Sequence, residues 1–145
     1  MPSIEWRYSD ARLIIPIAVF AASHAQNASE LVRTDGLIDT GATRSGIRSD
    51  VARRLNLHSE SQRRIETANG PIFAREYLVR FGLFAGDFTQ GETDARNHYP
   101  VVLDHHFFAF ELAAGFTYPV LIGMDVISQC DLHVLRDGNA RIDLP

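Results

Sequence analysis

The stretch LIDTGATRSGI, residues 37–47, places a single carboxylate between an apolar pair and a turn of small residues. The apolar pair puts Asp39 at the end of a buried strand, where an aspartate is costly unless it is paired or used chemically. Gly41 allows a sharp turn and leaves its backbone N–H free to hold a carboxylate, while Thr40 supplies a hydroxyl. We therefore interpret Asp39 as a positioned acid rather than a surface charge.

The composition predicts one compact domain over residues 1–145. With 145 residues and 46% hydrophobic content, the chain is long enough for a real core but too short for two full catalytic lobes. The net charge is −4, so we expect no nucleic acid bound across the surface. Six arginines crowd into one stretch, and we favour a solvated helix face and strand edge over a site for an anionic partner: Arg44, Arg48, Arg53, Arg54, Arg63 and Arg64.

The single cysteine, Cys130, excludes an intrachain disulfide and fits a reducing compartment, so we expect a cytoplasmic location. Residues 12–25, RLIIPIAVFAASHA, have features of a signal peptide, but Glu5 and Asp10 make the leading segment acidic as well as basic, and Pro16 interrupts the apolar run. We therefore expect no secretion signal. No other stretch is long and apolar enough to span a bilayer, so no membrane contact is expected.

The first half of the chain predicts a strand hairpin followed by a short helix. Residues 12–20 and 31–39 have strand composition, Pro16 marks an edge or a bulge, and 21–30 form the loop between them. The spacing of Ile47, Val51 and Leu55 by four residues predicts a helix that ends near Asn56, with Ser49 as its N-terminal cap.

The second half is also dominated by predicted strands. Two strand-like runs within residues 61–84 surround Asn69–Gly70, a strong hairpin signal, and Pro71 constrains the second arm. Further along, the sequence predicts a polar loop over 85–98 and a strand over 99–103. Residues 104–119 are expected to form either a helical turn stopped by Gly115 or an aromatic-rich loop. Within 119–130 we expect a strand and a short helix separated by Gly123, followed by a final hairpin that turns at Asp137–Gly138. This pattern indicates an all-β fold, a small closed barrel with two short helices.

Residues 39–42, D-T-G-A, resemble the active-site loop of aspartic proteases. Residues 119–127, PVLIGMDVI, resemble the apolar-apolar-Gly strand and the helix that wrap this loop in the single-domain, retroviral-type (retropepsin-like) members. The order of hairpin, Asp-Thr-Gly, flap-like hairpin, glycine strand and helix also matches, and the resemblance spans residues 12 to about 132. It implies the retropepsin-like barrel and hydrolysis of peptide bonds.

The resemblance also implies a homodimer. Aspartic proteases use two carboxylates about 3 Å apart that share one proton, one acting as general base on a water while the other donates to the scissile carbonyl. This chain has one Asp-Thr-Gly, and Asp35, Asp104 and Asp125 have different settings. We therefore expect an obligate two-fold dimer with two copies of Asp39 on its axis, and activity that is bell-shaped in pH on the acid side of neutral or near it.

Site roles follow from the same resemblance. The catalytic residues would be Asp39, Thr40 and Gly41, with no cofactor and no metal. An extended peptide would bind beneath a flap that excludes water. The residues expected to contact it are Ala42, Ala68, Asn69, Gly70, Pro71, Ile122 and Gly123. Side chains that form either an apolar pocket or simply core are Ile72, Phe73, Phe107, Phe108, Phe110 and Ile122.

Three other hypotheses remain open from the sequence. D-T-G-A-T also fits a phosphate-binding D-x-G-x-T loop, although such folds need two large domains. Residues 104–106, D-H-H, occur in some metal-dependent phosphoesterases, but the other histidines lack ligand spacing. A protease-like fold that binds peptides or dimerises without cutting is the third. Met1 and the whole-domain layout lead us to expect no large pro-segment.

Overall fold

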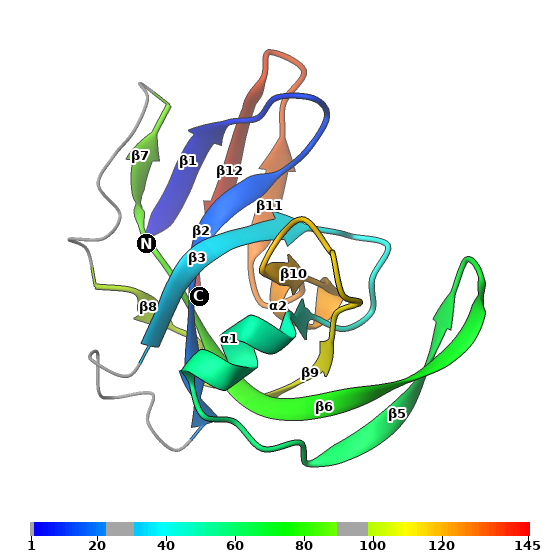
Figure 1. The fold of residues 1–145 in the computed structure, drawn as a ribbon. Helices are drawn as coiled ribbons and strands as arrows, with labels where there is room; N and C mark the ends of the chain where they lie inside the picture. Colours follow the sequence, from blue (N-terminus) through cyan, green and yellow to red (C-terminus); the bar gives the residue numbers. More distant parts are fainter. Residues whose placement is uncertain (1, 23–30, 90–98) are drawn as a thin grey trace.

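The structure, a computed structural model, describes residues 2–22, 31–89 and 99–145. Its smaller sheet has four strands in the order β11–β12–β1–β7 (Figure 1). The bounds are β1 Ser3–Arg7, β7 Gly86–Phe88, β11 Asp131–Val134 and β12 Asn139–Asp143. Because β1 pairs with β12, the two ends of the chain lie close together.

The larger sheet has eight strands and carries the Asp39 loop. Its main path runs β2–β3–β10–β4–β9–β6–β5, and β8 pairs with β6. The bounds are β2 Ile14–Ala21, β3 Leu31–Ile38, β4 Gly46–Ile47, β5 Ser61–Thr67, β6 Gly70–Leu83, β8 Val101–Val102, β9 Phe107–Glu111 and β10 Val120–Ile122. β6 pairs with β2 as well, through Ile17–Ala21, so the sheet curves until these two strands lie side by side.

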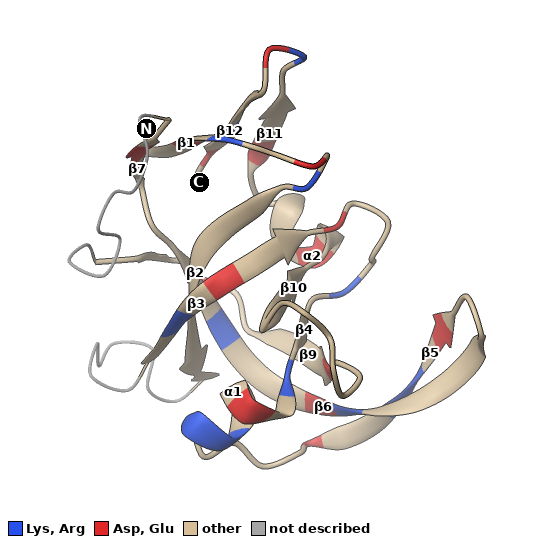
Figure 2. Ribbon diagram, turned by 45° about the horizontal axis from the view of Figure 1, so that its top comes forward, with Lys and Arg blue, Asp and Glu red and all other residues tan. Residues whose placement is uncertain are grey.

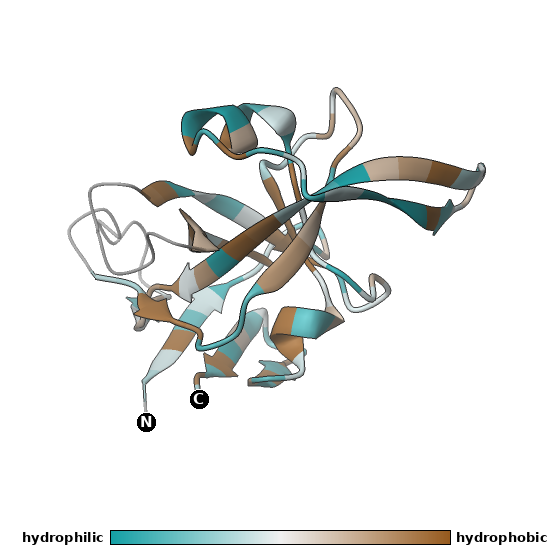
Figure 3. Ribbon diagram, turned by 90° about the horizontal axis from the view of Figure 1, so that it is seen from below, coloured by the Kyte–Doolittle hydropathy of each residue, from teal (hydrophilic) through white to brown (hydrophobic). Residues whose placement is uncertain are grey.

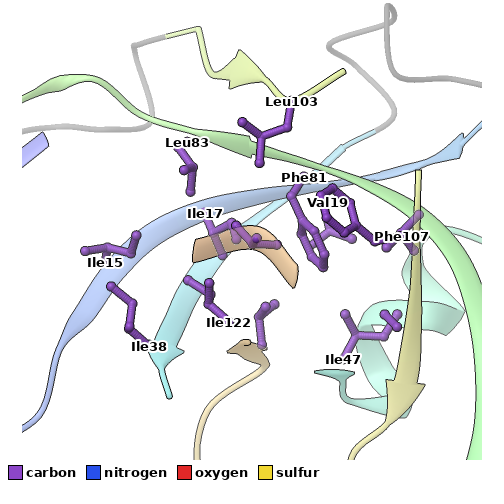
Figure 4. Packing of buried hydrophobic residues seen from close by; sticks show 14 of the residues in the cluster. Ile15, Ile17, Val19, Ile38, Ile47, Phe81, Leu83, Leu103, Phe107 and Ile122 are labelled. Atoms are coloured by element: carbon purple, nitrogen blue, oxygen red, sulfur yellow. The ribbon is translucent and has the colours of Figure 1, made fainter. Parts of the chain in front are cut away.

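The main core lies within the curve of this sheet. Alternate residues of β2, namely Ile15, Ile17 and Val19, point inward, and side chains from β6, β9 and β10 meet them (Figure 4). The Phe81 and Phe107 rings pack with their centroids 5.4 Å apart. A fully buried isoleucine or phenylalanine contributes about 1.5–3 kcal/mol relative to an exposed one, so this cluster fixes the strands that position the loop.

The two strands before Asp39 confirm the sequence prediction. β2 and β3 are antiparallel neighbours, and the 23–30 part of the predicted loop lies outside the described residues. Pro16 pairs with Asp35 of β3, whereas β6 pairs with β2 only from Ile17 onward. Pro16, which has no N–H to donate, therefore lies on a stretch of β2 that has one neighbour, as an edge position requires.

The helices are short, and one detail of their prediction is wrong. α1 spans Ser49–Arg54, but Arg48 is its N-cap residue and no side chain caps it, so Ser49 is the first helical residue instead. The helix ends two residues before Asn56, whose φ of 52° is left-handed, a conformation that asparagine tolerates after a helix. α2 spans Met124–Ile127. Neither helix in the described part of the chain has the length or hydropathy to cross a membrane.

The segment 104–119 was predicted as a helical turn or a loop, and both alternatives are wrong for its first half. Residues Phe107–Glu111 form β9, which lies between β4 and β6. Two neighbours supply its hydrogen bonds, and that tertiary pairing overrides a weak local pattern. Three more strands, β1, β4 and β7, were not predicted, and the strand expected over 99–103 is reduced to β8.

Both predicted hairpins in the second half are present. In the first, Thr67 pairs with Gly70, so the turn residues are Ala68 and Asn69 and the turn lies one residue earlier than Asn69–Gly70. Gly70 follows with a φ of 101°, a left-handed conformation that glycine adopts readily because it has no Cβ. In the second, β11 and β12 pair across a turn in which Gly138 has a φ of 93°.

Candidate active site

The backbone on both sides of Asp39 is anchored to the sheet. β3 pairs in parallel with β10, so Ile38 lies beside Ile122. The Asp39 N–H donates to the Ile122 carbonyl at 2.9 Å, and the Ile38 N–H donates to the Leu13 carbonyl at 2.8 Å. Asp39 therefore leaves the sheet from a fixed point, with its side chain half-buried.

The carboxylate is held within its own turn. The Gly41 N–H donates to Asp39 Oδ1 at 2.9 Å, and the Ala42 N–H donates to the Asp39 carbonyl at 3.1 Å. A Cβ at position 41 would lie 3.2 Å from Oδ1, so glycine suits this close approach. In the described residues no hydrogen bond reaches Oδ2, and Thr40 and Gly41 are exposed. One carboxylate oxygen is thus left for a group from outside this turn.

A second carboxylate, that of Asp125, hydrogen-bonds to the loop that carries Asp39. Its Oδ1 accepts the Ser45 hydroxyl at 2.7 Å and the Val126 N–H at 2.9 Å, while its Oδ2 accepts the Ser45 N–H at 3.0 Å. The Ser45 oxygen in turn accepts the Gly123 N–H at 2.9 Å. Backbone bonds from α2 to the Ala42 and Thr43 carbonyls complete the contact. α2 and the loop after Asp39 are therefore one hydrogen-bonded unit.

Gly123 and Ile122 lie beneath this loop. A Cβ at position 123 would be 2.5 Å from the Arg44 carbonyl carbon and 2.9 Å from the Ser45 nitrogen, so only glycine fits without a backbone shift. Ile122 is buried in the main core. The structure thus brings Asp39, Thr40, Gly41 and Ala42 together with these two residues; peptide contact by Ile122 or Gly123 stays a prediction.

The other predicted substrate-binding residues lie at the tip of the β5–β6 hairpin. This hairpin projects from the body of the molecule, as Figures 1 and 3 show. Ala68, Asn69 and Pro71 are exposed, and Gly70 is half-buried. The hydrophobic stretch near the tip includes Ile72 and Phe73, which are 43% and 74% exposed. Among the described residues, no hydrogen bond or ion pair joins the tip to the Asp39 loop.

The root of the hairpin contacts the loop through a buried glutamate that sequence reasoning missed. The Glu76 side chain on β6 is only 3% exposed. Its Oε2 lies 3.0 Å from Arg63 Nε and 3.5 Å from Arg44 Nη1, and its Oε1 accepts the Ser61 hydroxyl at 2.9 Å. Arg44 belongs to the Asp39 loop and Arg63 to β5. The only sequence signal was a glutamate on the same strand face as Ile72 and Ala74.

The crowded arginines are largely paired. Arg48 lies 3.0 Å from Asp50, and Arg64 lies 3.2 Å from Glu66, in addition to the two arginines on Glu76. Figure 2 shows both signs of charge along β5 and β6. The hydrogen bond from Arg48 holds the pKa of Asp50 below its usual value. Arg53 and Arg54 are exposed on α1.

The remaining candidates separate into core and surface. Phe107 and Ile122 belong to the main core, whereas Ile72, Phe73 and Phe108 are exposed. Residues 104–106 are exposed, and the described part of the chain has no group of three or more side chains arranged to hold a metal ion.

Comparisons with known proteins place this geometry in context. A family model described as aspartyl protease matches residues 28–126, and no curated protein matches the chain. A retropepsin-like aspartic protease from Rickettsia conorii superposes with a TM-score of 0.62 at 14% identity, over 98% of this chain and 90% of that one. A protein of unknown function from Legionella pneumophila gives a TM-score of 0.43 at 14% identity, over 86% of each chain.

Proposed function

The chain belongs to the aspartyl protease family and has the retropepsin-like fold, and from this premise we propose that it is an aspartic endopeptidase whose active site is shared by two subunits. The observation that carries the proposal is the Asp39 turn, which presents a carboxylate with one oxygen held by the Gly41 N–H and the other open. Such a carboxylate can bind a water molecule, because no ion pair with a neighbouring side chain occupies it.

The dimer follows from the chemistry of the missing partner. Two carboxylates are needed so that one removes a proton from water while the other donates to the scissile carbonyl. Asp125 is already occupied by Ser45 and Val126, and Asp35 is exposed on β3. A second copy of Asp39, brought by a two-fold axis, would supply the same geometry from the other side.

The remaining roles are part of the same proposal. Thr40 and Gly41 would orient the two loops, and the hairpin tip at residues 68–71 would close over an extended peptide as a flap. Ala42, Ile122 and Gly123 would line the site from below. The pairing of β6 with β2 supports a closed barrel beneath the loop. The cytoplasmic location stays a prediction.

The test is cleavage of a mixed peptide library between about pH 3 and about pH 8. Wild type is compared with Asp39→Asn, which keeps the size of the side chain but removes the acid. Asp35→Asn is the matched control, because Asp35 is an exposed aspartate four positions earlier, on β3, the strand that leads into Asp39. Each protein is assayed over a range of concentrations.

We expect wild type and Asp35→Asn to cut the same bonds, Asp39→Asn to be inactive, and specific activity to fall on dilution. A wild type that is folded but cuts nothing at any pH would instead favour a peptide-binding or dimerisation module without catalysis. Cleavage that survives in Asp39→Asn would contradict the assignment of the catalytic acid.

A further inference from the structure

Positive charge is in excess where the β5–β6 hairpin meets the Asp39 loop. Arg44 and Arg63 both approach Oε2 of Glu76, so two guanidinium groups share one carboxylate. The third polar contact of Glu76 is the neutral Ser61 hydroxyl. These three charged groups therefore sum to one positive charge, next to the loop that carries Asp39.

Arg63 binds Glu76 more closely than Arg44 does, so Arg44 is the weaker-held of the two guanidinium groups. Arg63 Nε donates a hydrogen bond to Oε2 at 3.0 Å, whereas Arg44 Nη1 stands 3.5 Å from the same oxygen, an ion pair without a hydrogen bond. The Arg44 side chain is 39% exposed. A guanidinium has five N–H donors in a planar fork that suits a carboxylate, and no hydrogen bond from the Arg44 guanidinium is found among the described residues.

The position of Arg44 relates it to a bound peptide. It lies five residues after Asp39 in the same loop, and the ion pair with Glu76 shows that its side chain extends toward the root of the hairpin. The face of β6 that carries Glu76 also carries Ala74 and Ile72; Glu76 and Ala74 are buried, whereas Ile72, nearer the tip, is exposed. A peptide that passes between the Asp39 loop and the hairpin would run beside this guanidinium.

We propose that Arg44 binds an acidic side chain of the substrate, so that the enzyme prefers peptides with Asp or Glu at one fixed position near the cleaved bond. This specificity rests on the proposed peptidase activity. Arg63 acts indirectly: because it neutralises Glu76, Arg44 is free to face the peptide.

The experiment uses peptide pairs made from a sequence that wild type cleaves, with Glu or Gln placed at each position in turn. The ratio of kcat/KM for Glu over Gln is measured for wild type, Arg44→Gln, Arg63→Gln and Arg53→Gln. The last variant removes the same charge from the exposed face of α1 and is the matched control.

We expect wild type to prefer Glu over Gln at one position by roughly fivefold, the upper range for a partly exposed ion pair. The preference should weaken with added salt, disappear in Arg44→Gln, and persist in Arg53→Gln. Arg63→Gln should reduce it, because Glu76 then draws Arg44 to itself. The ratio of kcat/KM for Glu over Gln within each variant separates charge recognition from a merely structural role, because a structural effect of Arg44→Gln would lower kcat/KM for both peptides alike.

Cleavage by wild type with no preference for Glu at any position would overturn this proposal and leave the peptidase intact. A preference that survives undiminished in Arg44→Gln would overturn it as well. If Arg44→Gln fails to fold, the result for Arg63→Gln decides: a reduced preference for Glu supports the proposal, and an unchanged preference overturns it. A folded wild type that cleaves nothing would overturn the proposed function, and this specificity with it.

Discussion

At the scale of single residues, Asp125 holds the loop that carries Asp39: its carboxylate accepts hydrogen bonds from Ser45, and its own N–H donates to the Thr43 carbonyl. Asp125 accepts three hydrogen bonds, two of them from Ser45, and every one of these partners is a donor. An ionised carboxylate accepts at both oxygens, whereas an amide of the same shape offers one accepting and one donating end. The charge of Asp125 therefore matters for geometry rather than for chemistry.

Asp125→Asn should accordingly destabilise the protein by about 1–3 kcal/mol, because an amide nitrogen would face a donor. We expect kcat to fall because the loop that carries Asp39 loosens, with a smaller change in KM. Urea unfolding and steady-state kinetics measure the two effects. Ser45→Ala removes the same link from the other side, so the double variant should cost less than the sum of the singles. Strictly additive effects would show that the two residues act independently.

Gly123 offers a steric test of the same unit. A methyl group there would meet the backbone of Arg44 and Ser45 at 2.5–2.9 Å, so Gly123→Ala must move one of the two segments. We expect a loss of about 1–3 kcal/mol, typical of overpacking, together with reduced activity. The unfolding midpoint in urea reports the first and peptide cleavage the second. Ser128→Ala, at an exposed position next to α2, is the control: it removes only a 3.4 Å hydrogen bond from its hydroxyl to the Asp125 carbonyl and should change both much less.

At the scale of elements, the β5–β6 hairpin owes its turn to Gly70. Its φ is 101°, and a Cβ added there would have no atom within 4 Å, so position 70 resists side chains because of backbone strain and not because of crowding. Gly70→Ala should cost about 1 kcal/mol locally and lower kcat/KM if the tip acts as a flap. Gly70→Asn tolerates the left-handed conformation better and should retain more activity. Equal activity in both variants would speak against a flap whose turn geometry matters.

The elements also show where sequence reasoning succeeds. β2, β3, β10 and the two hairpins were predicted because each carries a local signal: β-branched runs, an apolar strand before Gly123, or a turn with glycine. β9 carries no such signal, and the polar-apolar alternation of β1, SIEWR, extends over only five residues. β9 becomes a strand by pairing with β4 and β6, and β1 by pairing with β12 and β7. The Asp39 turn was predicted because its residues are consecutive in the sequence. The Glu76 cluster was not predicted, because its residues come from three separate segments: β5, β6 and the Asp39 loop.

At the scale of the whole molecule, acid conditions test stability and activity together. The pKa of Asp50 is lowered chiefly by its hydrogen bond from Arg48, and the pKa of Asp143 chiefly by its hydrogen bond from Arg141. A carboxyl whose folded pKa lies below its unfolded value stabilises the fold above the unfolded pKa, and this contribution is lost as the pH falls through the folded pKa. The loss should therefore appear below the ordinary value of 3.8.

We expect the urea midpoint of wild type to drop as the pH falls from about 5 to about 2, and Asp50→Asn to show a smaller drop. The exposed Asp35→Asn serves as control and should follow wild type. If Asp50→Asn loses as much stability as wild type over this range, the Arg48 contact does not contribute to acid stability. The same curves show which part of an acidic activity profile reflects unfolding rather than titration of the site.

The measurement that most directly tests the shared active site is subunit mixing with Asp39→Asn. Wild type is held at a fixed concentration, an equal amount of the variant is added, and the subunits are allowed to exchange before peptide cleavage is assayed. If each site needs two copies of Asp39, random pairing should reduce activity to about half. Asp35→Asn mixed in the same way should instead add its own activity. Undiminished cleavage after full exchange with Asp39→Asn would contradict a site built from two subunits.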